Sequence, residues 1–275
     1  MNYINHALTA LLDLLMTPLG RIGPAWALFV VSLLAGLMML LIFRRTSNQA
    51  RIKEAKDKMQ AHLIEILLFK DSPRIILRAL KNLIRYNGMY MRYAFTPMIY
   101  MILPVSLLLI HLDGWFGYRP LHVGESAIFS VTLSPEGPNV LSRVSIETDK
   151  GMILETQPLR ILENGEIDWR VRADTPGEHI ITVNASGHTV RKKIQVAETS
   201  LTRLSKVMVG SSFLDVLLNP GEGPIEPGLF IHTISIGYPA REIEIFGWRA
   251  HWLLLFFILS IAGGFAFKKV LKIEI

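Results

Sequence analysis

Four basic residues recur at a spacing that fits one face of a helix. They are Arg74, Arg78, Lys81 and Arg85, separated by four, three and four positions, and residues three or four apart share a helix face. Such a row can bind the phosphates of anionic lipid or of ribosomal RNA, or an acidic partner protein. The alternative is that these charges only orient the chain in a membrane, which would not require them to form a row.

The residue types that build active sites are not grouped in this chain. It contains no Cys, which excludes thiolate metal sites and Cys nucleophiles. Its eight His are scattered, and the sequence has no GxSxG, HExxH or P-loop Lys motif. We therefore predict no enzyme, no cofactor and no metal. His111 and His251 could meet as a metal or proton site, although an interfacial position is the commoner role for such side chains.

The composition indicates a membrane protein. Hydrophobic residues make up 51% of the 275, and the mean hydropathy is +0.36, which excludes an ordinary soluble domain and a disordered chain. Segments 24–43, 94–112 and 247–267 are apolar over about the 20 residues that a helix needs to cross a bilayer. The net charge of +6 does not indicate DNA as a partner, because the basic residues do not cover a soluble surface.

The charges between these segments predict the orientation. Residues 44–93 carry twelve Lys and Arg against four acids, whereas residues 113–250 carry thirteen against seventeen. Because basic loops stay in the cytoplasm, we expect 44–93 and the tail 268–275 inside, and the N-terminus and 113–250 outside, in the cytoplasmic membrane of a prokaryote. The first basic residue, Arg21, follows a largely apolar stretch, so no cleaved signal peptide is predicted.

Two parts of the chain show helical periodicity outside the spans. Residues 1–23 form an amphipathic pattern that predicts a helix lying on the outer membrane surface. Residues 44–93 predict a coiled-coil-like helical hairpin, with a break at Asp71-Ser72-Pro73 and an end at Asn87-Gly88. The stripes expected to face each other are apolar: Ile52, Ala55, Met59, Leu63, Ile66 and Leu67 on the first helix, and Ile76, Leu80, Leu83 and Ile84 on the second.

Short runs of alternating apolar and polar residues follow the second span. They are separated by turn signals such as those at 135–138, Asn164-Gly165 and 175–177, a pattern typical of an antiparallel sandwich. We predict an immunoglobulin-like domain over 113–199, with Trp169 in its core. Residues 200–246 are expected to form a separate membrane-proximal segment with a short helix at 212–218 and two strands. The fold class is therefore α+β, with three transmembrane helices, a cytoplasmic hairpin and an extracytoplasmic β-sandwich.

Polar residues in the spans predict a shallow groove open to the cytoplasm. None of the spans has Asp, Glu or Lys near its middle, which argues against an ion-coupled transporter. Pro97 and Pro104 would kink the second span, either to open such a groove or simply to pack helices. The residues expected to line the groove or contact a client are Ser32, Arg44, Arg45, Arg92, Thr96, Met98, Tyr100, Met101, Ser106 and Ser260.

The order of these elements resembles the YidC-type membrane insertase superfamily, in particular its three-span members among archaeal and endoplasmic-reticulum proteins. The resemblance covers about 1–115 and 247–275, and rests on GRIGPAWALFVVSLLAGLMMLLIFRR and NGMYMRYAFTPMIYMILPVSLLL. It implies an insertase whose hairpin receives nascent or tail-anchored hydrophobic segments, with anionic lipid and the ribosome or translocon as further partners. The Met residues of the second span would suit variable clients.

A different class of function is also open. The spans could be anchors for a scaffold whose outer domain binds an envelope protein. We prefer the insertase, on the resemblance of the span order.

Overall fold

The structure is a computed structural model that describes residues 2–134, 144–185, 187–198, 201–245 and 247–271. It is α+β, with helices and antiparallel sheets. The chain divides into two compact units: a sheet unit, Met1–Leu28 with Leu107–Leu253, and a helical unit, Phe29–Ser106 with Leu254–Ile275. The predicted turn at 135–138 and residues 272–275 of the predicted tail lie outside the described residues.

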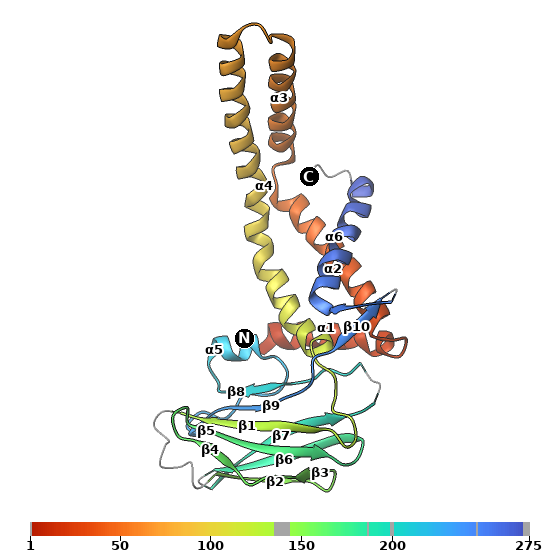
Figure 1. Ribbon diagram of the computed structural model, residues 1–275, viewed down its shortest axis with the longest axis vertical. Coiled ribbons are helices and arrows are strands. Elements are labelled where there is room, and N and C mark those ends of the chain that lie inside the picture. The colour runs from red at the N-terminus through yellow and green to blue at the C-terminus, as the bar shows by residue number, and fades with distance from the viewer. Residues whose placement is uncertain (1, 135–143, 186, 199–200, 246, 272–275) are drawn as a thin grey trace. The chain divides into compact units, whose positions relative to one another are not determined.

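The sheet unit contains two antiparallel sheets that share its core and a separate two-stranded hairpin, Glu242–Ile245 with Trp248–His251 (Figure 1). The larger has the order β3-β5-β1-β9-β8, with β4 also paired to β5, and the smaller has the order β2-β6-β7. The bounds are β1 Ser126–Leu133, β2 Val144–Thr148, β3 Met152–Leu154, β4 Leu159–Ile161, β5 Glu166–Ala173, β6 Gly177–Ala185, β7 His188–Val196, β8 Val207–Val209 and β9 Ile231–Ile236. Six of these strands coincide with the alternating runs of the sequence.

Both sheets contribute to one hydrophobic core. Phe129 on β1 and Trp169 on β5 lie there with ring centroids 6.3 Å apart, and Ile181 on β6 and Ile194 on β7 enter it from the other sheet. Every second residue of these strands is buried, as expected when side chains alternate between the two faces of a sheet. The prediction that Trp169 is a core residue is confirmed.

The predicted boundary of the β domain at residue 199 is wrong. Strand β9 pairs with β1, with Phe129 opposite Ile236, and β8 pairs with β9, so residues from 207 to 236 complete the larger sheet. Alternation within a strand shows that it has a buried face, but it does not show which distant strand lies beside it. The short helix expected there is α5, Phe213–Leu218.

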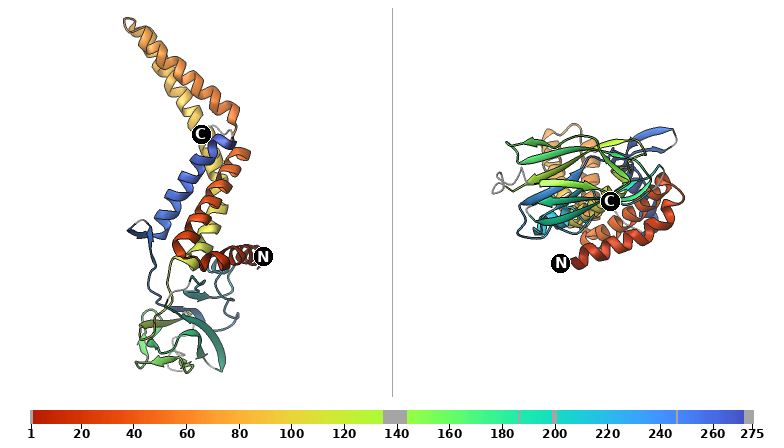
Figure 2. Two further views of the ribbon diagram at one scale, coloured as in Figure 1. Left: turned by 90° about the vertical axis from the view of Figure 1, so that its right-hand side faces the viewer. Right: turned by 90° about the horizontal axis from the view of Figure 1, so that it is seen from below.

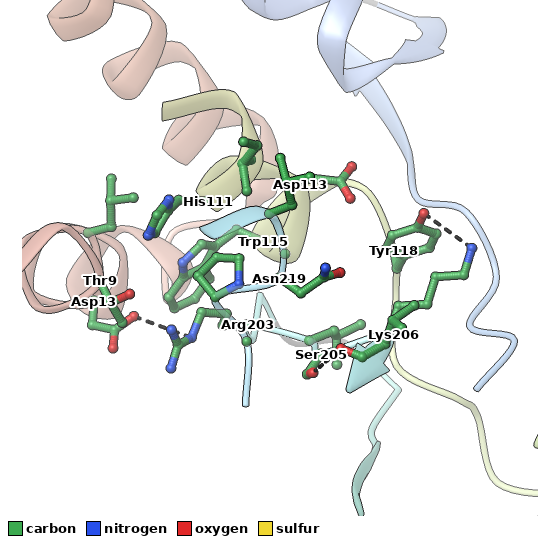
Figure 3. Close-up of a pocket in the computed structure, with 18 residues that line it drawn as sticks. Thr9, Asp13, His111, Asp113, Trp115, Tyr118, Arg203, Ser205, Lys206 and Asn219 are labelled. Carbon is green, nitrogen blue, oxygen red and sulfur yellow. Dashed lines mark hydrogen bonds and ion pairs between the residues drawn. The ribbon is translucent and has the colours of Figure 1, made fainter. Parts of the chain in front are cut away.

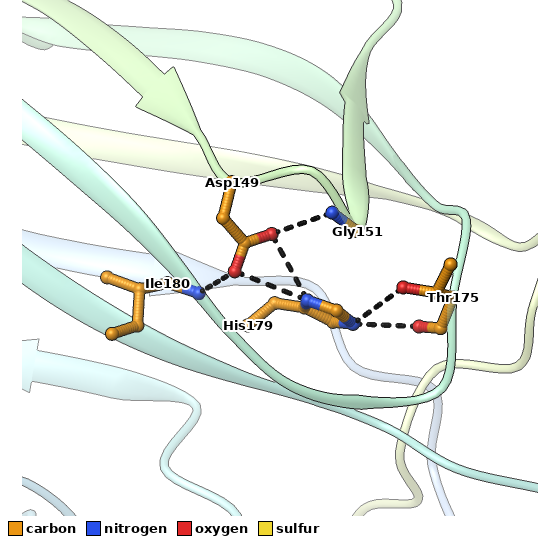
Figure 4. A network of polar contacts seen from close by, with 5 residues as sticks. All are labelled: Asp149, Gly151, Thr175, His179 and Ile180. Atoms are coloured by element: carbon orange, nitrogen blue, oxygen red, sulfur yellow. Dashed lines mark hydrogen bonds and ion pairs between the residues drawn. The ribbon is translucent and has the colours of Figure 1, made fainter.

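A polar network joins the turn after β2 to the start of β6 (Figure 4). The Asp149 carboxylate accepts hydrogen bonds from the backbone N–H groups of Gly151 at 3.0 Å and Ile180 at 2.9 Å, and lies 3.1 Å from His179 Nδ1. His179 Nε2 lies 2.8 Å from the carbonyl oxygen of Thr175. A Cβ on Gly151 would lie 1.9 Å from the His179 ring, so only glycine fits. The network holds two turns together.

A buried ion pair holds the Gly- and Pro-rich loop after α5. Lys192 on β7 is fully buried, and its Nζ lies 2.7 Å from both the Glu222 carboxylate and the Ser205 carbonyl oxygen. Burial lowers the pKa of Lys192, and the Glu222 charge opposes that shift. The ion pair between Glu222 of the loop and Lys192 of β7 therefore attaches the loop to the sheet.

We expect Glu222→Ala to destabilise the protein by about 3–5 kcal/mol, because it leaves a buried ammonium without its counter-charge. Replacing both partners, Lys192→Met with Glu222→Gln, should recover most of that loss. The control is Lys193→Met, which removes a pair with Glu178 at a side chain 59% exposed and should cost less than about 1 kcal/mol. Thermal unfolding of the full chain in detergent measures the stability of all three variants. Equal losses for Glu222→Ala and the double variant would contradict this role of the ion pair.

A surface ion pair predicts acid sensitivity. The Arg119 guanidinium donates two hydrogen bonds to Glu125, at 2.7 and 2.9 Å, and these lower the pKa of that carboxyl from 4.5 to about 2. Since the folded pKa is below the unfolded one, the ionised group stabilises the fold above about pH 4.5, and this contribution disappears as the pH falls toward 2. We expect Glu125→Gln to flatten the decline of melting temperature between these pH values, whereas Glu163→Gln, at an exposed position, should leave the slope unchanged.

Helix α1, Asn2–Gly20, belongs to the sheet unit. The sequence predicts this helix, but its polar stripe faces the protein: Asn5 Nδ2 donates to the Val216 carbonyl at 2.9 Å, and Asp13 lies 3.7 Å from Arg203 Nε. Leu11 and Leu14 are instead 62% and 76% exposed. The helix therefore presents apolar side chains outward.

The helical unit contains most of α2 (Pro24–Thr46), α3 (Gln49–Leu68), α4 (Pro73–Phe116) and α6 (Trp252–Leu271). By length and composition, α2 and α4 could each cross a membrane. The apolar part of α6, Trp252–Lys268, is shorter. Strands β10 (Glu242–Ile245) and β11 (Trp248–His251) pair with each other, so the predicted start of the third helix at 247 is wrong by five residues.

The predicted end of the hairpin at Asn87-Gly88 is also wrong. Helix α4 continues without a break through Gly88, Pro97 and Pro104. A glycine inside a helix costs only about 1 kcal/mol relative to alanine, which the apolar residues on either side can offset. Helix α3 runs back alongside the first part of α4 (Figures 1 and 2). The hairpin and the predicted second span thus share one helix.

Candidate functional site

The hairpin of α3 and α4 is held together by a row of tyrosines. Tyr86, Tyr90 and Tyr93 recur along α4, and basic side chains of α3 lie over their rings. Lys58 is 5.2 Å from the centroid of Tyr86, and Arg51 is 5.7 Å from that of Tyr93 and donates a hydrogen bond to its hydroxyl at 3.0 Å. Each such cation–π contact contributes about 0.5–1 kcal/mol at an exposed position. The tyrosine spacing of three and four is the signal in the sequence, and the predicted site did not include it.

The end of the hairpin exposes a group of large apolar side chains, which we call the apolar tip. Helices α3 and α4 are antiparallel, so the last turns of α3 and the first turns of α4 lie at the same end. Leu67 and Leu68 are 63% and 72% exposed, and Leu77 and Ile84 are 68% and 67% exposed. The apolar tip consists of Leu63, Ile64, Leu67, Leu68, Phe69, Leu77, Leu80 and Ile84. A cluster of exposed large apolar side chains is a candidate binding surface.

Four residues of the apolar tip correct a prediction. Leu63, Leu67, Leu80 and Ile84 were expected to face the partner helix, but between 44% and 67% of each is exposed. The prediction holds for Ile52 and Ala55 of the α3 stripe, which are buried, and Ala79 of α4 is buried as well. Two helices alone bury only one narrow stripe each, so a wider apolar face necessarily stays in contact with solvent.

The predicted basic row is present on α4. Arg74, Arg78, Lys81 and Arg85 are all exposed, and none has an acidic partner within 4.0 Å among the residues that the structure describes. At 3.6 residues per turn, the exposed stripe of Leu77, Leu80 and Ile84 lies beside this row. Basic and apolar side chains therefore share one surface.

Two of the predicted groove residues are not on a groove. Ser32 and Ser260 are 0% and 2% exposed, at a close contact of α2 with α6. A Cβ on Gly36 would lie 2.3 Å from the Ser260 carbonyl oxygen, and one on Gly263 would lie 2.8 Å from Leu33 Cδ2. Small residues four apart, Ser32 with Gly36 and Ser260 with Gly264, allow the backbones this approach. Their spacing is typical of helix packing, a role that the predicted groove did not include.

The other predicted groove residues lie at the surface of their helices. Thr96, Met98, Tyr100 and Ser106 are exposed on α4, and Met101 is half-buried. The Thr96 hydroxyl donates to the Arg92 carbonyl oxygen at 2.9 Å, which satisfies it within the helix.

The three basic residues predicted for the groove, Arg44, Arg45 and Arg92, are also exposed. Arg45 borders a surface hollow of about 450 Å³ whose other lining residues, such as Leu37 and Leu41, are apolar and come from α2. Ser32 and Ser260 are therefore buried in their helices, and the predicted polar lining is not assembled in this hollow.

The two candidate His residues have separate partners. His111 is 3% exposed, and its Nδ1 donates to the Leu107 carbonyl at 2.9 Å, whereas His251 is exposed and its Nδ1 accepts a hydrogen bond from the Leu253 amide at 3.3 Å. Within the described residues, three or more His, Asp or Glu side chains nowhere gather as they would to bind a metal ion.

No model of a protein family matches the sequence, and no curated protein matches it. Among solved structures, the crystal structure of domains 4 and 5 of the S-layer protein SbsC is similar at 18% identity and a TM-score of 0.21, over 30% of this chain and 48% of that one. The chain thus spans about half the length of that structure.

Proposed function

We propose that this protein is a membrane insertase or chaperone. In this proposal it spans the cytoplasmic membrane of a prokaryote with three helices, α2, α4 and α6, with the hairpin and C-terminus inside and the sheet unit outside. The charge difference between 44–93 and 113–250 supports this orientation. The resemblance to the YidC-type superfamily in the order of these elements supports the activity.

The observation that carries the proposal is the apolar tip beside the basic row. A hydrophobic segment leaving the ribosome exposes apolar surface to water, and covering it contributes about 25 cal/mol for each Å² buried. Leu67, Leu68 and Leu77 can supply that cover. Arg74, Arg78, Lys81 and Arg85 can bind anionic lipid headgroups or ribosomal RNA, which would keep the tip where such segments appear.

The continuity of α4 suggests how a client reaches the membrane. The helix has 44 residues, or about 66 Å at 1.5 Å per residue, and includes both the hairpin arm and the predicted second span. Its apolar exposure continues along the predicted span at Ile99, Ile102 and Leu103, which are 63–69% exposed. A client bound at the tip can therefore pass along one continuous apolar face.

Photo-crosslinking in growing cells tests the proposal. A photoreactive amino acid at Leu68 or Met98 should give adducts to many newly made membrane proteins, and one at Leu162, an equally exposed residue of the sheet unit, should not. Depletion of the protein should also remove short-tailed membrane proteins selectively. Adducts confined to one stable partner of the sheet unit would instead favour an envelope scaffold and overturn the insertase.

A further inference from the structure

The sheet unit contains a cavity of about 230 Å³ that client insertion by the hairpin does not use (Figure 3). Three segments far apart in the sequence form its walls: α1, the last turns of α4, and residues 203–221. The Leu204 amide donates to the Gly114 carbonyl at 2.7 Å, and a Cβ on Gly114 would lie 3.2 Å from the Leu204 carbonyl oxygen. The walls are therefore fixed by backbone contact.

The cavity is lined by charges of both signs. Arg203 and Lys206 contribute two cations from one segment, and Asp13 of α1 and Asp113 of α4 contribute two carboxylates. Asp13 Oδ1 lies 3.7 Å from Arg203 Nε, which is an ion pair but too long for a hydrogen bond. Lys206 Nζ lies 3.4 Å from the Tyr118 hydroxyl. Figure 3 shows the Asp13–Arg203 pair and the Tyr118–Lys206 pair on different sides of the cavity.

Several buried polar atoms of this lining have no hydrogen bond within the described part of the protein. They are Nε2 of His111, Nη1 of Arg203 and Oδ1 of Asp13. A buried polar group left unpaired destabilises the fold, so a ligand that pairs with it gains affinity. A ligand that offers both an acceptor and a donor would satisfy the Arg203 donor and a carboxylate of the lining together.

Apolar surface adjoins the cavity. Leu218 of α5 lines it and is 54% exposed, and Phe213 and Leu214 of the same helix are 50% and 60% exposed. Helix α1 is tied to α5 by the Asn5–Val216 hydrogen bond. Its outward Leu11 and Leu14 extend the apolar surface. A molecule with a charged head in the cavity can therefore place a hydrocarbon tail on α1 and α5.

We propose that this cavity binds the headgroup of a zwitterionic aminophospholipid from the outer leaflet. The phosphate accepts hydrogen bonds from Arg203 on one side of the cavity, and the primary ammonium donates to Asp113 on the other side. The acyl chains lie along Leu11, Leu14 and the exposed face of α5. This site fixes the depth of the sheet unit at the membrane surface, and it does not depend on client insertion by the hairpin.

Lipid-dependent thermal unfolding of the full chain in detergent tests the site. Phosphatidylethanolamine should raise the melting temperature. Phosphatidylcholine, whose ammonium has no proton to donate, phosphatidylglycerol, which has no ammonium, and inorganic phosphate should each raise it less. Equal shifts with all three lipids would mean non-specific lipid binding, and an equal shift with phosphate would mean a free-anion site. Either result, or no shift at all, overturns the proposal.

Two variants test whether phosphatidylethanolamine binds in this cavity. Arg203→Gln should weaken phosphatidylethanolamine binding at least about tenfold, the value of one charge-assisted hydrogen bond, and Arg191→Gln on the exposed surface of β7 should not. If Arg203→Gln does not fold, Asp113→Asn serves instead, because it should reduce the preference for phosphatidylethanolamine over phosphatidylcholine. Unchanged lipid preference in the variant that folds overturns the assignment of the headgroup to this cavity. Crosslinking from Leu68 should be unaffected by either variant.

Discussion

Replacing Leu67 and Leu68 with serine is expected to reduce crosslinking of newly made membrane proteins to the hairpin by about tenfold or more. Each leucine that becomes buried against a client contributes about 1.5–3 kcal/mol, and 1.4 kcal/mol corresponds to a factor of ten in binding. Since the two side chains are 63% and 72% exposed in the free protein, their loss should leave its stability nearly unchanged. The readout is crosslinking yield from a photoreactive residue at Met98, with melting temperature measured in parallel.

A matched control exists in the sheet unit. Leu159 and Leu162 are 62% and 74% exposed, so Leu159→Ser with Leu162→Ser removes the same amount of exposed apolar surface. This pair should not alter crosslinking. If both double variants bind clients as the unmodified protein does, the apolar tip is not the receiving surface.

Gly36→Ala is expected to lower the melting temperature by roughly 6–12 °C, which corresponds to about 3 kcal/mol. The added Cβ would lie 2.3 Å from the Ser260 carbonyl oxygen, a backbone atom that cannot rotate away. Helices α2 and α6 must then separate. Thermal unfolding in detergent and the amount of folded protein in membranes both report this loss.

A glycine-to-alanine substitution at Gly88 should raise the stability of the protein instead of lowering it. Gly88 lies inside α4, and a Cβ added there would meet no atom of the described chain within 4 Å beyond its own helix backbone. Gly88→Ala should therefore stabilise the protein by about 0.4–1 kcal/mol, because alanine reduces the conformational entropy of the unfolded chain. Similar melting temperatures for the two variants would show that the α2–α6 contact is looser than the structure indicates.

The comparison of Gly36 with Gly88 also shows the limit of prediction from sequence. Both are glycines in helices, and only the neighbouring helix distinguishes them. The same holds for Ser32 and Ser260, which the sequence suggests as polar groove residues because spans contain few hydroxyls. Their packing partners reveal small-residue contacts instead. Thr96 and Met98 are exposed on α4, but nothing in the local pattern shows whether a second wall faces them.

Local patterns in the sequence were enough to predict which segments are helices and strands. The recurrence of apolar residues, every 3.6 residues in a helix and every 2 in a strand, is a local property of the sequence. Helices α1 and α3, strands β1 and β5, and most other elements therefore lie where the patterns predict them. Residue charge likewise located the basic row on α4. Which faces of these elements are covered depends on long-range packing. The pairing of β9 with β1, the exposure of Leu67, and the meeting of Asp13, His111 and Arg203 around one cavity all join residues distant in sequence. Such contacts depend on partner and register, which no local pattern encodes.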